Sequence, residues 1–99
     1  MPASAWSVRI VPSAEKELAS LPAEAITQAL AALTELKEDP FHPETIDLKG
    51  LRQWRRTRFA VTYRIVYRVN ERDRRVLVLR IRSRRDAYRG LEPLIRPDW

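Results

Sequence analysis

Two arginine-bearing segments in the second half of the chain carry residue types suited to chemistry on a phosphate. In YRIVYR (residues 63–68), Arg64 and Arg68 fall on one side of a strand, and a second arginine run leads through Arg84 to Tyr88. A guanidinium can bind two phosphate oxygens at once and can stack on a base. A tyrosine beside such cations can act as a base or proton shuttle, because the cations stabilise the phenolate. The two segments predict a phosphate-binding face that could carry out chemistry.

The distribution of charge favours an anionic partner. Residues 1–50 carry four Lys or Arg and eight Asp or Glu, whereas residues 51–99 carry fifteen Arg and five acids, and the formal net charge is +6. Arginine outnumbers lysine sixteen to three. A polyanion is therefore the favoured partner. The alternative is that the arginines are only the solvated face of a sheet, compensated by acids on a bound protein.

Length and composition limit what the chain can be. With 99 residues, 44% of them hydrophobic, we expect one domain over residues 1–99. One histidine, His42, and no cysteine cannot supply a usual metal-ligand cluster, and the two glycines form no nucleotide-binding motif, so neither metal nor cofactor is expected. The chain shows no leader-like start and no apolar run of about 18 residues, which predicts a soluble cytoplasmic protein.

The elements that must position these residues begin with a strand and a short helix. Residues 6–11 alternate apolar and polar side chains, and Pro12 ends the strand because it has no N–H to donate. Ser13 is a suitable N-cap for a helix over residues 14–19.

A second, longer helix should begin near Pro22 and end by Asp39, since Pro40 disfavours helical geometry in the residue before it. Its expected apolar stripe has the spacing of one helix face and comprises Ile26, Ala29, Leu30 and Leu33. Residues 39–50 contain two prolines and a glycine without a sustained period, which indicates a linker. His42 lies in this linker, and we expect its side chain to be solvated.

The rest of the chain predicts three strands, over residues 54–59, 63–69 and 76–83. The connections at 60–62 and 70–74 suit antiparallel hairpins. The complete order is strand, helix, helix and three strands (β-α-α-β-β-β). We predict an α+β fold in which two N-terminal helices pack on one face of a twisted, mainly antiparallel sheet.

The two-residue period of a strand assigns the side chains to two faces. Those expected to face the helices are Phe59, Tyr63, Ile65, Tyr67, Val69, Leu77, Leu79 and Ile81. Those expected on the opposite, basic face are Arg56, Arg58, Arg64, Arg68, Arg80, Arg82 and Arg84. A bulge would exchange Arg56 and Arg58 for Arg55 and Thr57.

Three motifs make the chain similar to the RelE/ParE superfamily of bacterial toxin-antitoxin toxins. They are LKGL at residues 48–51, YRIVY at 63–67 and RRDAYR at 84–89. The resemblance extends over nearly the whole chain. It implies the RelE-like microbial RNase fold and a small cytoplasmic toxin that is held inactive by an antitoxin encoded beside it.

The two branches of the superfamily imply different activities. RelE-like toxins cut mRNA in the ribosomal A site, whereas ParE-like toxins share the fold but poison DNA gyrase and lack the nuclease residues. We interpret the chain as a RelE-like mRNA endoribonuclease that inhibits translation, because Arg84 and Tyr88 together look like the nuclease ending. The alternatives are a ParE-like gyrase inhibitor without catalysis and an inactive toxin homologue that acts as an antitoxin-bound corepressor.

The resemblance also implies site residues. The positions that match the cleavage residues of the RelE branch are Arg64, Arg84 and Tyr88. The further positions expected to bind RNA are Lys49, Arg56, Arg58, Arg68 and Arg82. Ser83 stands where related toxins commonly have a histidine, so a mechanism that uses an imidazole there does not carry over.

Metal-independent RNA cleavage begins with attack of a 2′-hydroxyl on the adjacent phosphate, and it needs a base, an acid and donors for the growing negative charge. Arginine can serve only the last need, because it stays protonated. Tyr88 is the candidate base or proton shuttle, or an aromatic that stacks on a base. The structural alternatives are a Tyr88 packed on the sheet edge and a salt bridge from Arg64 to Glu71 or Asp86.

Partners follow from the basic face and the resemblance. An uncovered basic face would bind RNA promiscuously, so a cognate antitoxin that covers it is expected. We expect this antitoxin to lie over the helices and the sheet edge and to displace the C-terminal segment, with Trp99 helping a partner to dock. The free toxin, a monomer, would bind mRNA and ribosomal RNA, and would reach operator DNA only through the antitoxin.

Overall fold

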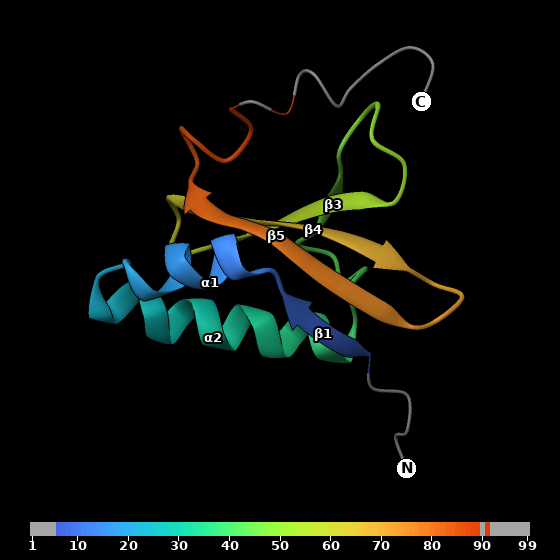
Figure 1. Ribbon diagram of the computed structural model, residues 1–99, viewed down its shortest axis with the longest axis horizontal. Helices are drawn as coiled ribbons and strands as arrows, with labels where there is room; N and C mark the ends of the chain where they lie inside the picture. Colours follow the sequence, from blue (N-terminus) through green and yellow to red (C-terminus); the bar gives the residue numbers. More distant parts are fainter. Residues whose placement is uncertain (1–5, 90, 92–99) are drawn as a thin grey trace.

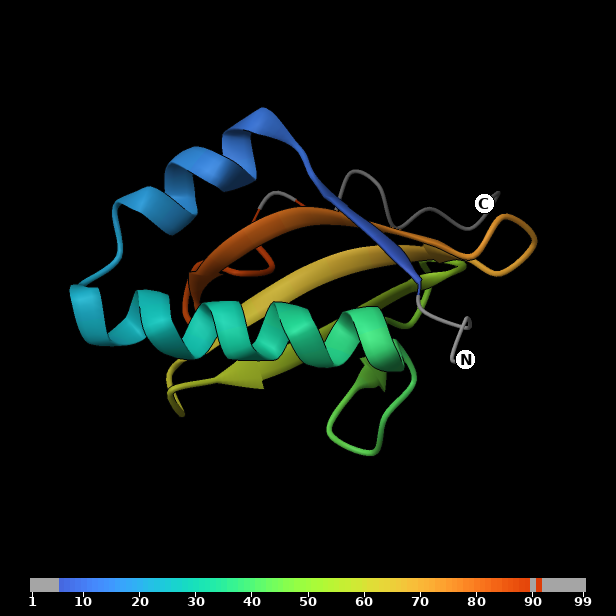
Figure 2. The same ribbon diagram turned by 90° about the horizontal axis from the view of Figure 1, so that it is seen from below.

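The computed structural model describes residues 6–89 and Leu91 and shows two helices on one face of a five-stranded sheet (Figures 1 and 2). The elements are β1 (Ser7–Ile10), α1 (Pro12–Ala19), α2 (Ala23–Glu38), β2 (Ile46–Asp47), β3 (Trp54–Phe59), β4 (Tyr63–Asn70) and β5 (Arg75–Ser83). The strand order is β1-β5-β4-β3-β2, with β1 parallel to β5 and the other neighbours antiparallel. The expected α+β fold is confirmed. Neither helix is long and apolar enough to cross a membrane.

The segment expected to be a linker contains the fifth strand. Ile46 and Asp47 of β2 pair with β3, and Arg55 Nη1 donates to the Asp47 carboxylate at 2.6 Å. Both β2 residues are exposed. The segment therefore has no apolar alternation from which a strand could be predicted.

Both helices begin next to a proline. Pro12 is the first residue of α1, Val11 occupies the N-cap position, and no side chain caps this helix end, so the prediction that Ser13 is the cap was wrong. Proline suits a first helical turn because the N–H that it lacks would have no partner there. The second helix follows Pro22 and ends at Glu38, as expected.

The buried face of α2 differs from the expected stripe. Its buried residues are Ala25, Ala29, Ala32, Leu33 and Leu36. Leu30 was expected among them but is 51% exposed. Small alanines let the helix lie close to the sheet, and Leu36 supplies the large buried side chain. An alanine-rich helix offers several apolar arcs, and the packing against the sheet selects one of them.

One irregularity in β5 changes which of its residues face the helices. Its pairing with β4 shifts by one residue after the Val66–Arg80 pair, so Leu79 is the extra residue of a β-bulge. The residues that β5 contributes to the main core are Val76, Val78 and Ile81. Leu77 lies on the opposite face. The prediction that Leu77 and Leu79 face the helices was therefore wrong, because a bulge exchanges the faces of the residues that precede it.

The register of β3 with β4 is regular, and the bulge considered for β3 is absent. Thr57 pairs with Ile65 and Phe59 with Tyr63, and all four side chains belong to the helix-facing side. Arg56 and Arg58 therefore lie on the face away from the helices, as expected.

A second, smaller apolar cluster lies on that opposite face. Its buried members are Leu51, Val66, Ala87 and Leu91, with Leu48, Trp54 and Tyr88 packed against them. The loop before β3 and the turn after β5 both fold over the side of the sheet away from the helices (Figure 1). These two segments divide the basic face into two ends.

The connection from α2 to β3 is held against the sheet by polar contacts. The buried Tyr67 hydroxyl donates to Pro40 O at 2.6 Å, and Arg55 Nη2 donates to Thr45 Oγ1 at 2.7 Å. The His42 side chain is only 14% exposed. The prediction of a solvated His42 was therefore wrong, because the segment packs on the sheet instead of running free.

Candidate active site

Arg64 is the buried cation of the basic face. It lies on β4, opposite Arg58 of β3 and Arg82 of β5, and it is 7% exposed. Its Nη1 donates to Val61 O at 3.0 Å and to Tyr63 O at 2.9 Å. These two carbonyl groups fix the guanidinium in place.

Arg64 has no carboxylate partner among residues 6–89 and Leu91. The salt bridge to Glu71 or Asp86 that was considered from the sequence is not formed. Buried charges in proteins are usually paired, because desolvation of an ion is costly. Arg64 is therefore a desolvated cation whose charge is not compensated by an acid in the described part of the chain.

The surroundings of Arg64 are positive. Burial lowers the pKa of the Arg64 guanidinium, the Tyr88 side chain opposes this change, and the charges of Arg56 and Arg58 lower it further. The group nevertheless remains protonated at neutral pH. The local electrostatics favour the arrival of an anion.

Tyr88 reaches Arg64 from the turn that follows β5. The Tyr88 side chain lies close enough to the Arg64 guanidinium to oppose the lowering of its pKa. The turn is held by the hydrogen bond from Ala87 N to Ser83 O at 2.8 Å, and Arg80 Nη1 donates to Ala87 O at 3.2 Å. The Tyr88 ring packs against the smaller apolar cluster. Tyr88 is thus both a packed aromatic and a neighbour of Arg64.

Arg84 is the first residue after β5, in the turn that carries Tyr88, and its side chain is exposed. Its backbone N–H donates at 2.6 Å to the carbonyl of Thr62, in the turn between β3 and β4. In the same turn Ala60 and Val61 have φ values of 49° and 61°, a strained conformation for a β-branched residue. The turn thereby presents one carbonyl to the Arg64 side chain and another to the Arg84 backbone.

The residues expected to bind RNA are not gathered in one place. Arg56 and Arg58 lie near Arg64. Arg82 donates from Nε to the Glu17 carboxylate of α1 at 2.5 Å, which compensates its charge. Lys49 is exposed on the loop that folds over the basic face.

Arg68 lies apart from the Arg64 group. It is on the same strand and the same face, but four residues further along, a distance of about 13 Å. The loop and the turn that carry the smaller apolar cluster separate the two positions. The structure thus brings Arg64, Tyr88, Arg56, Arg58 and Arg84 to one end of the face and leaves Arg68 at the other.

Sequence reasoning missed two supporting residues. Arg80 was expected on the basic face, but its hydrogen bonds to the carbonyls of Ala87 and Arg89 hold the turn that carries Tyr88. Glu17 also accepts a hydrogen bond from Ile81 N at 2.9 Å, and so joins α1 to the end of β5. Neither role could be predicted from the sequence, because each contact depends on how the folded chain brings the two groups together. In the described residues, no three His, Cys, Asp or Glu side chains are grouped to hold a metal ion.

The family of the chain follows from a family model for the ParE toxin of type II toxin-antitoxin systems, which matches residues 8–88. The chain therefore belongs to this family, within the RelE/ParE superfamily, and the resemblance seen in the sequence is confirmed. The protein is a toxin of the type II toxin-antitoxin class.

Several solved structures share the fold. RelE in the archaeal RelE–RelB complex from Pyrococcus horikoshii OT3 is 27% identical, with a TM-score of 0.67 over 81% of this chain and 96% of that one. The toxin-antitoxin complex RelBE2 from Mycobacterium tuberculosis includes a chain that is 25% identical, with a TM-score of 0.68 over 81% and 99%. The isolated E. coli RelE toxin is 24% identical, with a TM-score of 0.70 over 80% and 84%. No curated protein matches the sequence significantly.

Proposed function

We propose that this toxin is a metal-independent endoribonuclease of the cytoplasm that cuts mRNA in the ribosomal A site. The observation that carries the proposal is the buried Arg64, which has positive neighbours and no acidic partner in the described residues. An RNA phosphate would supply the missing negative charge. Tyr88, whose side chain lies near the Arg64 guanidinium, would supply a group able to move a proton beside that phosphate.

In the proposed reaction the 2′-oxygen attacks the adjacent phosphorus, and the bond from phosphorus to the 5′-oxygen breaks. In this step Tyr88 acts as its phenolate: it takes the proton of the 2′-hydroxyl, becomes a neutral phenol, and gives that proton to the leaving 5′-oxygen, which restores the phenolate. The charge of Arg64 favours the phenolate before the first transfer and after the second. Arg64, Arg56 and Arg58 stabilise the charge that develops on the phosphate. The two carbonyls that fix Arg64 make it a preorganised donor, which is the arrangement that stabilises a transition state best.

The roles of the remaining arginines follow from their exposure. Arg84 is exposed in the turn that carries Tyr88, and in the proposal it binds the scissile phosphate from the solvent side. Lys49 binds the RNA backbone from the neighbouring loop. Arg82 contributes less, because Glu17 compensates its charge.

A second candidate function is inhibition of DNA gyrase without catalysis. The family model that matches the chain is that of ParE toxins, which favours this alternative. The basic face would then bind a protein surface, and the packing of Tyr88 on the smaller apolar cluster would only hold the turn after β5 in place.

We also propose a cognate antitoxin as partner, with contact to operator DNA only through it. Solved structures of similar toxins include complexes with their antitoxins, which supports this partner. The antitoxin lies over the helices and the sheet edge and displaces the turn that carries Tyr88. A structure of the complex in which Tyr88 still contacts Arg64 would contradict the displacement. Trp99 lies outside the described residues.

The test is cleavage of a defined mRNA on programmed ribosomes, mapped by primer extension, with gyrase supercoiling measured in parallel. Wild type is compared with Arg84→Ala and Tyr88→Phe, and with Lys37→Ala as a control of equal charge change on α2, away from the site. We expect a cut with wild type and the Lys37 variant, retained in the presence of EDTA, and a loss of about 100-fold or more in the site variants.

Gyrase inhibition without an RNA cut would replace the proposal with the ParE-like alternative. Inactivity in both assays would indicate the corepressor. A cut that survives in Tyr88→Phe but not in Arg84→Ala would keep the nuclease and remove Tyr88 as its proton carrier.

A further inference from the structure

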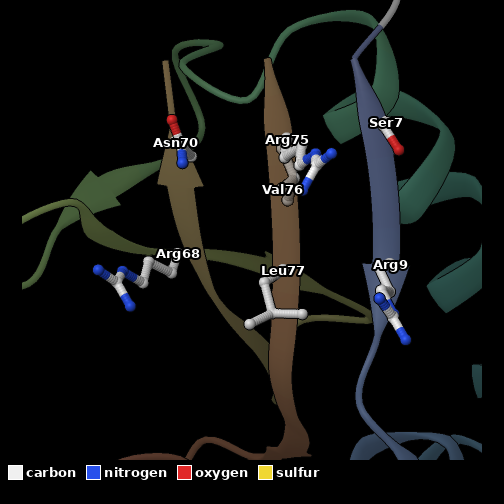
Figure 3. Close-up of a pocket in the computed structure, with 7 residues that line it drawn as sticks. All are labelled: Ser7, Arg9, Arg68, Asn70, Arg75, Val76 and Leu77. Atoms are coloured by element: carbon white, nitrogen blue, oxygen red, sulfur yellow. The ribbon is translucent and has the colours of Figure 1, made fainter. Parts of the chain in front are cut away.

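The end of the basic face that lies away from Tyr88 carries three exposed arginines around a hollow of about 540 Å³. They are Arg9 of β1, Arg75 of β5 and Arg68 of β4, and we call this surface the arginine shelf. Figure 3 shows Arg9 and Arg68 on the two sides of Leu77, with Arg75 extending toward Ser7. Arg9 lies beside Leu77 in the β1–β5 register, and Arg68 lies beside it in the β4–β5 register.

The side chains of the three shelf arginines form no hydrogen bond or ion pair with any described residue. This contrasts with Arg55 and Arg82, whose side chains pair with Asp47 and Glu17. Among the residues that the structure describes, none that lines the hollow carries a carboxylate. Asp73 in the β4–β5 turn already accepts a hydrogen bond from the Asn70 amide. The shelf is therefore a concentration of uncompensated positive charge.

The shelf exists because of the β-bulge. The extra residue Leu79 turns Leu77 and Arg75 to the face away from the helices, in line with Arg9 and Arg68. Without the bulge, Arg75 and Leu77 would face the helices. Leu77 is only partly buried and provides an apolar floor between cations, a combination that suits a ribose or base flanked by phosphates.

We propose that the arginine shelf binds the phosphate backbone of single-stranded RNA and is an anchoring site separate from the Arg64 end. Arginine binds phosphate oxygens in pairs and stacks on bases, and flexible exposed arginines accept any sequence. The shelf lies about 13 Å from Arg64 along β4. It therefore holds RNA outside the segment that contacts Arg64.

The test measures binding of a fluorescent 2′-O-methyl RNA of about 12 nucleotides by anisotropy over a series of salt concentrations. This RNA has no free 2′-hydroxyl and cannot be cleaved, so the result does not depend on the proposed nuclease activity. The Arg9→Gln/Arg68→Gln double variant is compared with Lys16→Gln/Lys37→Gln. The second pair removes the same charge from exposed positions on the helices. Circular dichroism confirms that all variants are folded.

Each phosphate contact of a single strand contributes about 0.7 to the slope of log affinity against log salt. The arginine double variant should therefore lower the slope by about 1.4 and the affinity at 0.1 M salt by about 25-fold. Addition of Arg75→Gln should extend the loss to about 100-fold, while the lysine double variant stays within a factor of about two. A triple Arg→Lys variant should keep the slope, because it keeps the charge.

Two results would overturn the proposal. If both double variants lose affinity equally, the protein binds RNA through its overall charge and not through the shelf. If poly-glutamate of equal charge displaces the RNA as well as unlabelled RNA does, and needs the same arginines, the shelf is a site for an acidic protein segment.

Discussion

The two faces of β4 show how one strand serves two purposes. On the side of the helices, Ile65, Tyr67 and Val69 are buried in the main core. On the other side, Arg64 is buried under a small apolar cluster while Arg68 is exposed. The first face contributes stability through apolar burial, and the second holds a desolvated cation that costs free energy. The difference indicates that the stability from one face permits an unfavourable but useful charge on the other.

The largest expected effect on stability comes from removing apolar volume on the side of β4 that faces the helices. Ile65 is 0% exposed, so Ile65→Ala should lower the free energy of unfolding by about 2–5 kcal/mol, and Ile65→Val by about 0.5–1.5 kcal/mol. Activity per folded molecule should not change, because Ile65 points away from the site. Urea denaturation followed by circular dichroism measures the effect. A loss below about 1 kcal/mol for the alanine variant would show that this face is not the main source of stability.

The neighbouring residue on the opposite face should give the reverse result. Arg64→Met removes a buried, unpaired charge, so the free energy of unfolding should stay level or rise. In the proposed reaction the same change removes a preorganised donor, so the cleavage rate should fall by about 10²–10³-fold. Denaturation and the ribosome assay are run on one preparation. A strong loss of stability in Arg64→Met would mean that Arg64 is a structural residue.

Tyr67 also lies on the side of β4 that faces the helices, and its contribution to the free energy of unfolding should depend on pH. Its hydroxyl bonds to Pro40 O at 2.6 Å, and Tyr67→Phe should cost about 1–3 kcal/mol because a buried carbonyl loses its donor. Burial raises the pKa of Tyr67, although hydrogen bonds from Thr45 and Arg55 oppose it. A folded-state pKa above the unfolded value of about 10 means that this contribution is complete below pH 10 or so. It is lost as the pH rises through the folded-state pKa.

Denaturant midpoints measured between neutral pH and the alkaline range test this dependence. Wild type should lose stability with a steeper slope above about pH 10 than Tyr67→Phe. The half-buried Tyr63, replaced by Phe, is the matched control. Equal slopes in wild type and Tyr67→Phe would contradict the assignment.

The smallest expected effect concerns the strained turn beside Arg64. Val61 has a φ of 61° and is 82% exposed, so Val61→Gly should relieve strain without loss of packing and raise the free energy of unfolding by roughly 1 kcal/mol. Val61→Ala keeps the Cβ atom and should gain less. A glycine variant that gains stability but loses activity would indicate that the rigid turn positions the carbonyl that holds Arg64.

Much of the fold could be predicted from local pattern. The alternation of apolar and polar side chains predicted the ends of β3, β4 and β5 to within about one residue. Pro40 correctly predicted the end of α2. The pattern failed where no periodicity exists, at the exposed two-residue β2, and where a bulge interrupts it, at Leu79. In α2, Leu30 shows that hydrophobicity alone does not select the buried arc.

The candidate site was predictable in its members but not in its arrangement. The strand period placed Arg56, Arg58 and Arg64 on one face. The same period placed Arg68 with them, although the folded loop and turn separate it from the Arg64 end. The Glu17 contact that compensates Arg82 joins residues 65 positions apart, and no local pattern reports such a contact.

The sequence by itself determined the basic face, the family and the order of the elements except β2, because these depend on residue types at short, regular spacings. Only the tertiary structure decided that Arg64 is buried without an acid while Arg82 has one, and that Arg9, Arg68 and Arg75 form a shelf. Burial and ion pairing depend on which distant segments meet. The bulge at Leu79 and the turn held by Arg80 are fixed by packing across the whole sheet.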